Sequence, residues 1–569
     1  MGEKTVSEFH KRHELLYGFS LPEEDVEIVC ARVTAIRRID KPKMEGEYEE
    51  HEPKPKCWRR VRFDEWIDTA VYGELKPGAI VDGPAIVEMY DSTLLIPPDK
   101  TAKVDPLGGE DMFNTAYSPN IRDRLDFSCA IALEDGRLVA QAEPIPVHLG
   151  SMAVGLRNLA NLKFDEGDVW MVNDPYVAGT HLNDVMMVKP LFYDGELVAL
   201  VANKAHHVDI GGCAPGSMNP NARELWQEGM VIPPIRIVEG NELRKDVSEF
   251  QRVRLGGGDS VRRKVREGQV GGCPKGVWRG RDHLEWDGKF INVDVEVKIE
   301  EDCVNFEGTH DSPINAVYGV TVASTCFALK SLLDPEMPMN YGFFNVVDVK
   351  APKGTIVNPI KPAPVSIGNV ETSQRIVDAI YKALSNEFPI PAASHGSMNN
   401  VLIGGRDWEF YETIGGGSGA RPNGDGVDGV HVNMTNTMNT PVEVIEREYP
   451  LRVLEYSFRP NSGGMGKYRG GLGLRRVIEV LEPSTLTVIA ERIRIRPWGL
   501  RGGKDGASGR CYVIKRNSEI IILTGKDTIE LEAGDRVVIE TPGGGGYDDP
   551  KERREDDLKR DLEDGKVTV

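Results

Sequence analysis

Apolar and polar residues alternate near the N-terminal end of the chain, in the pattern of half-buried β-strands. Residues 24–36 alternate in this way and are rich in β-branched side chains. A second apolar stretch, residues 78–104, is broken by glycine and proline into short runs. Together they predict a small β-rich unit that ends near Val104. The turn-forming sequence DPLGGED at residues 105–111 then predicts a domain boundary.

The middle of the chain carries two β-hairpin signals. The pairs Asp135-Gly136 and Asp194-Gly195 each stand between two apolar runs, and Asp-Gly favours the two-residue turns of hairpins. Helical periodicity lies near them, because Met152, Leu156 and Leu159 are spaced to share one helix face. We expect Ser151 to cap that helix. The middle of the chain is therefore predicted to be α+β.

The clearest helix is predicted over residues 371–386. Ile376, Ile380 and Leu384 follow one another at intervals of four, and Thr372 or Ser373 stands where a cap is expected. After about residue 400 the pattern changes to short β runs separated by glycine turns, which favours a β-sandwich-like or barrel-like region.

The predicted fold class is therefore α+β, a β-rich multi-domain architecture with a small N-terminal β-rich unit and a C-terminal β-sandwich-like region. We expect four parts: residues 1–108, 109–405, 406–550 and a charged tail, 551–569.

Two segments depart from these patterns. Residues 252–281 contain nine Lys and Arg against two acids, a net charge of +7, with hardly any apolar periodicity. An exposed disordered loop is favoured there over an anion-binding or subunit-contact loop. The tail has only Leu558 and Leu562 as an apolar pair, which predicts a solvated or fraying helix.

Charge and composition narrow the class of partner. The 569 residues include 69 Lys and Arg and 89 Asp and Glu, so the formal net charge is −20. Such a chain is not expected to bind nucleic acid or an anionic membrane. It lacks a run of about 18 apolar residues, and its charged N-terminus is unlike a signal peptide, so we expect a cytoplasmic protein. The eight cysteines form no CxxC pair, which argues against a zinc knuckle or a disulfide framework.

Potential metal ligands gather in one window. Of the 11 histidines in the chain, three lie between residues 181 and 207, beside several aspartates. His181 and Asp184 are three residues apart in a predicted loop that enters a strand, and His206 ends the hairpin strand that follows. Two imidazoles and one carboxylate would leave coordination positions open, as a catalytic Mn²⁺, Fe²⁺ or Zn²⁺ requires. The alternative is that these side chains are ordinary polar groups at strand ends.

Other residues near this window have less defined roles. His207 and Asp209 are candidates to orient a ligand imidazole. Asp174 could be a ligand, an acceptor behind a ligand, or the cap of its own Asp-Pro turn. The glycine loop at residues 410–421 lacks the spacing of a phosphate-binding loop, and a plain turn is favoured there. The sequence has no GxSxG, HExxH or kinase motif.

The chain resembles the hydantoinase B/5-oxoprolinase family, which includes the acetone carboxylase alpha subunit. The resemblance covers nearly all of residues 111–564, and its motifs are YSPNIRDRLDFSCAI, PVHLGSM, NDPYVAGTHLND, ANKAHHVDIGG, GNVETSQRIVDAI, PAASHGSMNN, YRGGLGLRR, RPWGLRGG and ETPGGGGYDDP. The first ~105 residues, with FHKRHELLYGFSLP and DGPAIVEMYDSTLLIPP, resemble the C-terminal end of the partner hydantoinase A family. The chain thus looks like the back half of a fused A–B oxoprolinase.

The resemblance implies a two-part chemistry. In this family an ATPase in the A part phosphorylates the substrate carbonyl oxygen, and the B part completes the reaction at a metal that activates water. In the carboxylase branch the metal is manganese, held by a His-x-x-Asp pair and a later His, which correspond to His181, Asp184 and His206. Three departures stand out: the ATPase core is absent, a helical stretch expected after about Val247 is replaced by the basic segment, and Asn433 stands where many members have a histidine.

The sequence therefore predicts a hydrolase subunit that opens a cyclic amide such as 5-oxoproline or a hydantoin. We expect it to act with a hydantoinase A-type ATPase that binds ATP, in a hetero-oligomer, with manganese as the favoured metal and zinc or iron as alternatives. His148, His207 and Asp209 are the expected catalytic pocket residues beside the three ligands. The alternatives are an acetone carboxylase-like subunit that carboxylates a ketone, and a non-catalytic remnant or assembly subunit.

Overall fold

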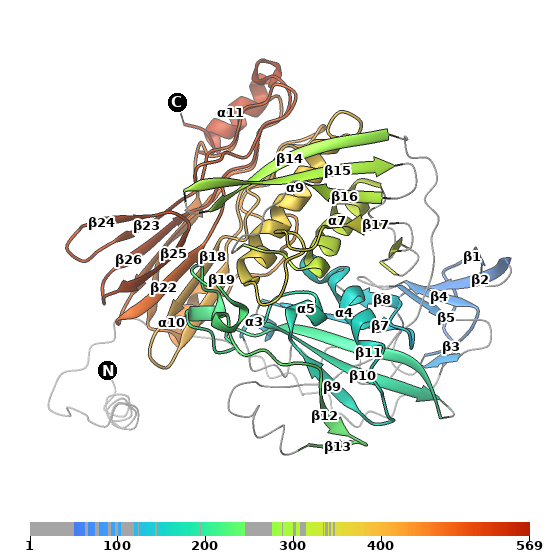
Figure 1. The fold of residues 1–569 in the computed structure, drawn as a ribbon. Coiled ribbons are helices and arrows are strands. Elements are labelled where there is room, and N and C mark those ends of the chain that lie inside the picture. Colours follow the sequence, from blue (N-terminus) through green and yellow to red (C-terminus); the bar gives the residue numbers. More distant parts are fainter. Residues whose placement is uncertain are drawn as a thin grey trace, which may run out of the picture. The chain divides into compact units, whose positions relative to one another are not determined.

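The computed structural model describes residues 51–103, 119–244, 276–307 and 314–568, with short gaps inside these ranges. All described elements belong to the compact unit Glu49–Val569. They are a mixture of helices and several sheets, which confirms the α+β class (Figure 1). Within the described residues, the longest apolar helices fall short of what is needed to cross a membrane.

The N-terminal part of the described chain is the predicted small β unit. Its main sheet has the strand order β1-β2-β4-β5, and β3 pairs with β6. The strands are β1 (Cys57–Arg62), β2 (Trp66–Tyr72), β3 (Ile80–Asp82), β4 (Ala85–Glu88), β5 (Thr93–Ile96) and β6 (Thr101–Lys103). The strand predicted at residues 24–36 lies outside the described residues.

A seven-stranded sheet in the order β13-β12-β9-β10-β11-β7-β8 forms the middle of the chain. Its strands are β7 (Phe127–Ala132), β8 (Leu138–Ala142), β9 (Val169–Val172), β10 (Asp184–Tyr193), β11 (Glu196–His206), β12 (Ile235–Glu239) and β13 (Glu242–Leu243). Both predicted hairpins are confirmed, as β7–β8 and β10–β11. Gly136 and Gly195 have φ values of +78° and +80°, which is why glycine is favoured in these turns.

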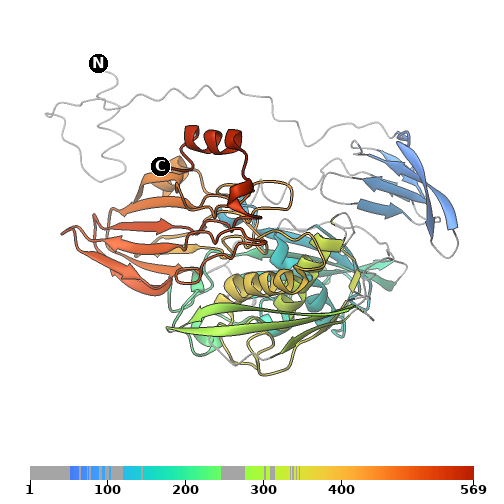
Figure 2. The ribbon, with the colours of Figure 1, turned by 90° about the horizontal axis from the view of Figure 1, so that it is seen from above.

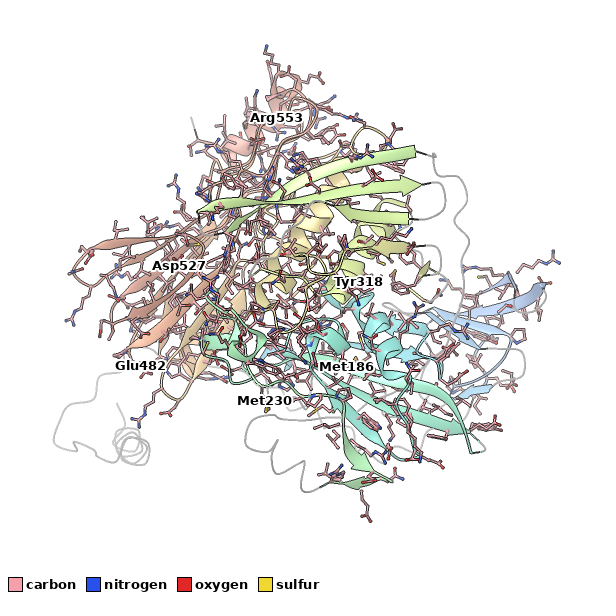
Figure 3. The ribbon with its side chains drawn as sticks, viewed as in Figure 1. Met186, Met230, Tyr318, Glu482, Asp527 and Arg553 are labelled. Atoms are coloured by element: carbon pink, nitrogen blue, oxygen red, sulfur yellow. The ribbon has the colours of Figure 1, made fainter. Side chains whose placement is uncertain are left out.

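Helix α4 (Ser151–Leu159) covers one face of this sheet. Met152, Leu156 and Leu159 are buried in one apolar cluster with Met186 and Val188 of β10. Met186 is labelled in Figure 3. The approach of the helix is close, because a Cβ placed on Gly155 would lie 3.1 Å from Met186 Cε. The predicted helix face is therefore confirmed, and it packs on the strand that begins at Asp184.

Both predicted helix caps are wrong. Helix α4 is preceded by Gly150, and the Ser151 hydroxyl donates backwards to the carbonyls of Val147 and His148. Helix α9 (Ser373–Leu384) continues a π-helical turn, η4 (Gly368–Thr372), so Thr372 and Ser373 stand inside a helix and not at its start. The hydroxyls of Ser151 and Ser373 bond to carbonyls of the preceding turn instead of capping a helix, and the Thr372 hydroxyl donates to the Ile314 carbonyl.

A four-stranded sheet, β14-β15-β16-β17, packs against α7 (Tyr318–Leu333) and α9 (Figure 2). Its strands are β14 (Gly276–Trp286), β15 (Lys289–Ile299), β16 (Cys303–Glu307) and β17 (Asp348–Lys350). Gly280 of β14 allows close packing on α9, because a Cβ there would lie 2.2 Å from the Ala379 carbonyl of that helix.

The basic segment is only partly described. Strand β14 includes residues 276–281, so the prediction of a disordered loop is wrong for the end of the basic segment. Residues 252–275 lie outside the described residues.

The C-terminal region is the predicted β-sandwich. One sheet has the order β19-β18-β22-β25 and the other β20-β21-β26-β23-β24, and their facing side chains share one apolar core. The strands are β18 (Asn400–Gly404), β19 (Glu409–Thr413), β20 (Leu451–Phe458), β21 (Leu474–Val480), β22 (Ser484–Ile489), β23 (Arg510–Ile514), β24 (Ile520–Leu523), β25 (Lys526–Leu531) and β26 (Arg536–Glu540). Helix α10 (Val442–Glu448) precedes β20. The domain boundaries that we expect within the chain remain predictions.

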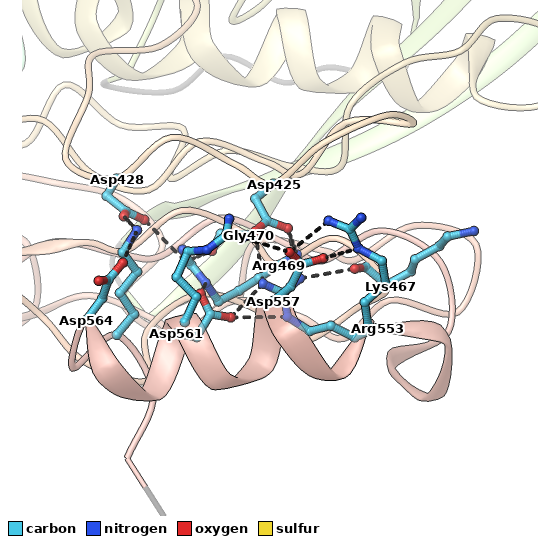
Figure 4. A network of polar contacts seen from close by, with 12 residues as sticks. Asp425, Asp428, Lys467, Arg469, Gly470, Arg553, Asp557, Asp561 and Asp564 are labelled. Atoms are coloured by element: carbon cyan, nitrogen blue, oxygen red, sulfur yellow. Dashed lines mark hydrogen bonds and ion pairs between the residues drawn. The ribbon is translucent and has the colours of Figure 1, made fainter.

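The charged tail forms the expected helix, α11 (Glu555–Glu563), after the short turn η5 (Pro550–Glu552), but the helix is not simply solvated. Asp561 is 4% exposed and accepts from two arginines, with 3.3 Å to Arg469 Nε and 2.6 Å to Arg553 Nη2. Arg553 also pairs with Asp425 at 2.9 Å (Figure 4). The prediction failed because α11 is held by buried ion pairs, whereas apolar periodicity reports only apolar contacts.

This network makes a stability prediction. Asp561→Ala should lower the free energy of unfolding by about 3 kcal/mol, because it leaves two buried guanidinium groups without a shared partner. The matched control lies in the same helix, where Glu563 forms an exposed pair with Lys559 at 3.8 Å; Glu563→Ala should cost at most about 0.5 kcal/mol. Urea denaturation measures the free energy of unfolding of both variants. Trypsin cleavage at Lys559 and Arg560 reports whether the helix itself has loosened. Equal losses in the two variants would contradict the role of the network.

Candidate metal centre

Strand register brings two of the predicted ligands together. In the antiparallel pair β10–β11, Asp184 is the first residue of β10 and lies directly opposite His206, the last residue of β11. Side chains at directly opposed positions share a face of the sheet, with Cβ atoms about 5 Å apart. The hairpin therefore delivers a carboxylate and an imidazole to one edge of the sheet.

The turn before β10 supplies the third residue. The Asp184 amide donates to the His181 carbonyl at 3.1 Å, which folds the chain back by one turn. This turn follows the short helix α5 (Pro175–Ala178). The buried ammonium of Lys204 on β11 donates to the Ala178 carbonyl at 2.8 Å and to Thr180 Oγ1 at 3.1 Å. The strand that carries His206 thereby also holds the segment that carries His181.

The three side chains form a compact buried group. One ligand atom from each of His181, Asp184 and His206 can be chosen so that all three lie within 4.8 Å of one another. The exposed fraction is 1% for His181 and Asp184 and 4% for His206. His181 Nδ1, Asp184 Oδ1 and His206 Nε2 are buried atoms without a hydrogen bond among the described residues. Buried polar atoms are rarely left unpaired, so this donor set fits a divalent metal ion.

The electrostatics favour the protonation states that a metal needs. Burial by itself would raise the pKa of Asp184, but the neighbouring imidazoles of His181 and His148 hold that pKa well below its ordinary value. Burial, followed by the proximity of His181, lowers the pKa of His206 well below that of a free histidine. Asp184 is thus ionised and His206 neutral at neutral pH, and these are the forms that bind metal ions.

Surrounding side chains hold these groups in place. Asn120 of α3 (Pro119–Arg122) lies 3.2 Å from His206 Nδ1, and the His206 ring stacks on Tyr411 of β19 with centroids 5.3 Å apart. His148 on the short helix η1 (Pro146–His148) lies 3.3 Å from Asp184 Oδ2 through Nε2. Its other ring nitrogen is 2.9 Å from Ser128 Oγ. Each contact restricts the rotation of one proposed ligand or of its neighbour.

A small cavity of about 20 Å³ lies at the cluster, which is room for about one water molecule. Its lining combines the three proposed ligands with polar and apolar side chains from distant segments: Asp126, Ile145, Val147, His148, Asn369, Val370, Met398, Tyr411, Thr413, Met434, Thr435 and Thr437. Burial raises the pKa of Asp126, against the opposing effects of Arg124 and His148. A second carboxyl group, with a raised pKa, therefore lines the same cavity as Asp184.

The other residues predicted for the site have different positions. His148 does reach the cluster. The Asp209 carboxylate accepts from Ser217 Oγ at 3.0 Å and from the Gly211 amide. The main-chain amide of His207 donates to the Asn183 carbonyl at 2.9 Å, next to Asp184 in the sequence. Among the contacts of the described residues, neither side chain bonds to a proposed ligand.

Two further positions have structural roles. Of the three possibilities left open for Asp174, the structure supports the cap, because its carboxylate accepts from the Tyr176 amide at 3.1 Å. Asn433 donates to Asp378 at 3.2 Å and is not among the residues that line the cavity.

Sequence reasoning missed Asn120, Asp126, Tyr411 and Lys204. The first three reach the cluster from segments separated from it by roughly 60 to 230 positions, and no local pattern marks such contacts. Asn120 and Asp126 do stand inside the motif YSPNIRDRLDFSCAI, which is the only signal in the sequence that could have suggested them. Lys204 could have been suspected from its position near the end of a strand whose first part is mostly apolar.

Comparison with known families and proteins adds independent findings. The family model described as hydantoinase B/oxoprolinase matches residues 107–268 and 258–550. The model described as the hydantoinase/oxoprolinase C-terminal domain matches residues 3–107. Together the two matches span nearly the whole chain.

Three relatives illustrate the similarity. An uncharacterized protein of Methanocaldococcus jannaschii is 51% identical and covers 80% of this chain and 90% of its own length. 5-Oxoprolinase 1 of Arabidopsis thaliana is 31% identical over 95% of this chain and 52% of its own length. The B subunit of a putative D-/L-hydantoinase from a Pseudomonas species is 29% identical, with 81% and 90% covered. The chain thus spans about half the length of the 5-oxoprolinases that it matches.

Two solved structures share the fold. The ATP-dependent caprolactamase of Pseudomonas jessenii is similar with a TM-score of 0.70 and 26% identity, over 78% of this chain and 89% of that one. An acetone carboxylase solved without nucleotide also has a TM-score of 0.70, at 18% identity, over 80% of this chain and 75% of that one. At that identity, the second similarity concerns the fold alone.

The geometry predicts an order of effects on metal binding. His181→Ala and Asp184→Ala should each abolish stoichiometric binding of Mn²⁺ or Zn²⁺, whereas His148→Ala should weaken it about 10- to 100-fold, because His148 contacts a ligand. His283, whose ring lies 2.9 Å from Asn292 Oδ1 on another sheet, gives the control His283→Ala. Metal content by mass spectrometry and affinity by competition with a chelator measure the series. A wild-type protein that binds no metal would refute the site.

Proposed function

The chain belongs to the hydantoinase B/oxoprolinase family, and we propose that it is the subunit that opens a cyclic amide, such as 5-oxoproline or a hydantoin, at a divalent metal. The observation that carries the proposal is the buried cluster of His181, Asp184 and His206, in which each side chain has one buried atom without a hydrogen bond among the described residues. The family match and the caprolactamase similarity support a cyclic amide as the substrate class. Manganese is the proposed metal, with zinc or iron as alternatives.

The proposed reaction includes an ATP-dependent step that we assign to a second protein. The chain spans about half of the 5-oxoprolinases, and one relative is named as one subunit of a hydantoinase. We therefore propose a hydantoinase A-type ATPase as partner in a hetero-oligomer. Amide resonance makes a lactam carbonyl a poor electrophile. Phosphorylation of its oxygen by ATP would make the carbonyl carbon easier for water to attack. The ATP would be bound by the partner.

The metal would polarise the substrate oxygen and lower the pKa of water. Residues of this chain would bind the metal, orient its ligands and supply a proton. Asp184 and His206 would hold the metal through a carboxylate whose pKa is low and an imidazole whose pKa burial lowers. Asn120 and Tyr411 fix the plane of the His206 ring. Asp126, whose pKa burial raises, can hold a proton next to the reacting atoms for transfer to the ring nitrogen as it leaves.

The proposal predicts that the isolated chain neither hydrolyses ATP nor opens 5-oxoproline. Both activities should appear when it is combined with an A-type ATPase. With the partner present, His181→Ala should lower ring opening at least about 100-fold, because several kcal/mol of transition-state stabilisation are lost; His283→Ala should be near wild type.

Coupled assays of phosphate release and of ring opening test this prediction. Ring opening by the metal-depleted complex would contradict the metal proposal. Carboxylation of a ketone with no turnover of any lactam would favour the acetone carboxylase-like alternative, and inactivity of a metal-loaded complex toward both substrates would favour an assembly role.

A further inference from the structure

Asn369 is a polar residue beside the proposed ligands that has no role in the proposed reaction. It lies on the π-helical turn η4, is 3% exposed, and lines the same cavity as His181, Asp184 and His206. Its Oδ1 atom is buried without a hydrogen bond among the described residues. A buried amide oxygen left unpaired costs free energy, so a group that supplies the missing donor would be bound selectively there.

The main chain around Asn369 is firmly fixed. Gly368 packs so closely on the preceding segment that a Cβ would lie 1.7 Å from the Asn315 carbonyl oxygen. Ser373 Oγ donates to the Asn369 carbonyl at 2.7 Å, and Thr372 Oγ1 donates to the Ile314 carbonyl at 2.7 Å. The π-helical turn is thereby held from both sides, and single π-turns inside helices are frequent at functional sites.

A buried carboxylate secures the start of this helix. Glu228 accepts from the amides of Val365 and Ser366 at 2.9 to 3.0 Å and from Ser366 Oγ at 2.6 Å. These amides are the unpaired donors of a helix N-terminus. Asn369 therefore extends from a preorganised backbone, which is what a group that positions a ligand requires.

We propose that Asn369 recognises the ring N–H of a cyclic amide and so gives the site its selectivity for lactams and imides. The inference rests on the proposed function and deepens it. A carboxamide presents an acceptor oxygen and a donor nitrogen side by side. A cyclic amide in a small ring is held cis, so its carbonyl and N–H also lie side by side and match both groups of Asn369. A ketone or lactone of the same shape has no N–H and leaves Oδ1 unpaired.

The cavity can adapt to a small ring through its apolar wall. At about 20 Å³ it has room for about one water molecule, so a five-membered ring must displace side chains. Met398 and Met434 line this wall, and unbranched methionine side chains change rotamer more readily than other apolar residues. The side chains of Met398 and Met434 would move to admit the ring, while the main chain that carries Asn369 would stay in place.

Two ring compounds that differ at one ring atom test the inference. 2-Pyrrolidone has N–H where cyclopentanone has CH₂. Titration of zinc-loaded protein with each compound, followed by ligand-observed NMR, should show at least about tenfold tighter binding of the lactam. Asn369→Leu, which keeps the branching of the side chain but not its polar atoms, should reduce the ratio to about one. Asn369→Ala serves as the second variant if the leucine variant does not fold.

The control is a buried amide outside the cavity. Gln374 lies five residues further along the helix and is fully buried. Its Oε1 atom has no hydrogen bond within the described part of the chain, and its amide donates to the Val432 carbonyl at 3.2 Å. Gln374→Met should keep the lactam preference, with a melting temperature that reports any general loss of packing.

The outcomes separate this inference from the proposed function. A lactam preference that survives in both Asn369 variants would overturn the role of Asn369 while leaving cyclic-amide opening intact. A wild-type protein without any preference would also overturn it, and turnover of lactams by the complete complex would then decide the proposed function on its own.

Discussion

The antiparallel register of β10 and β11 is the constraint on which the candidate site depends. It places Asp184 directly opposite His206 at the edge of the seven-stranded sheet. A shift of one residue in either strand would turn one of these side chains to the other face. The apolar face that packs on α4 fixes the register, since Met186 and Val188 must point into that core. The same packing that stabilises the sheet therefore positions the proposed ligands.

The site concentrates polar groups where burial makes them costly. His181, Asp184 and His206 are almost inaccessible to solvent, and each has an atom without a hydrogen bond among the described residues. Such groups weaken the fold unless a ligand completes them. Around them, Lys204 and Glu228 use their charges to tie down main-chain atoms of the segments that carry His181 and Asn369. Without a bound ion, these buried groups thus lower the stability of the fold. Binding of a metal would restore part of that stability.

Local signals in the sequence predicted the local parts of this arrangement. The Asp-Gly turns indicated both hairpins, and the spacing of His181, Asp184 and His206 indicated those three residues as one group. Asn120, Tyr411 and Asn369 could not be found in this way, because they meet the cluster only when separate sheets and helices pack. The helix caps at Ser151 and Ser373 were misjudged because a serine inside a helix and a serine before one have the same sequence signal. The docked tail helix was missed because its contacts are ionic, as in the pair of Asp561 with Arg553.

X-ray absorption spectroscopy of the protein reconstituted with Mn²⁺ or Zn²⁺ tests the central claim most directly, because it reports which atoms surround the bound ion. The arrangement of His181, Asp184 and His206 predicts a first shell with two imidazole nitrogens, recognisable by the multiple scattering of their rings, together with oxygen ligands. A spectrum that shows only oxygen ligands and no imidazole scattering would contradict it.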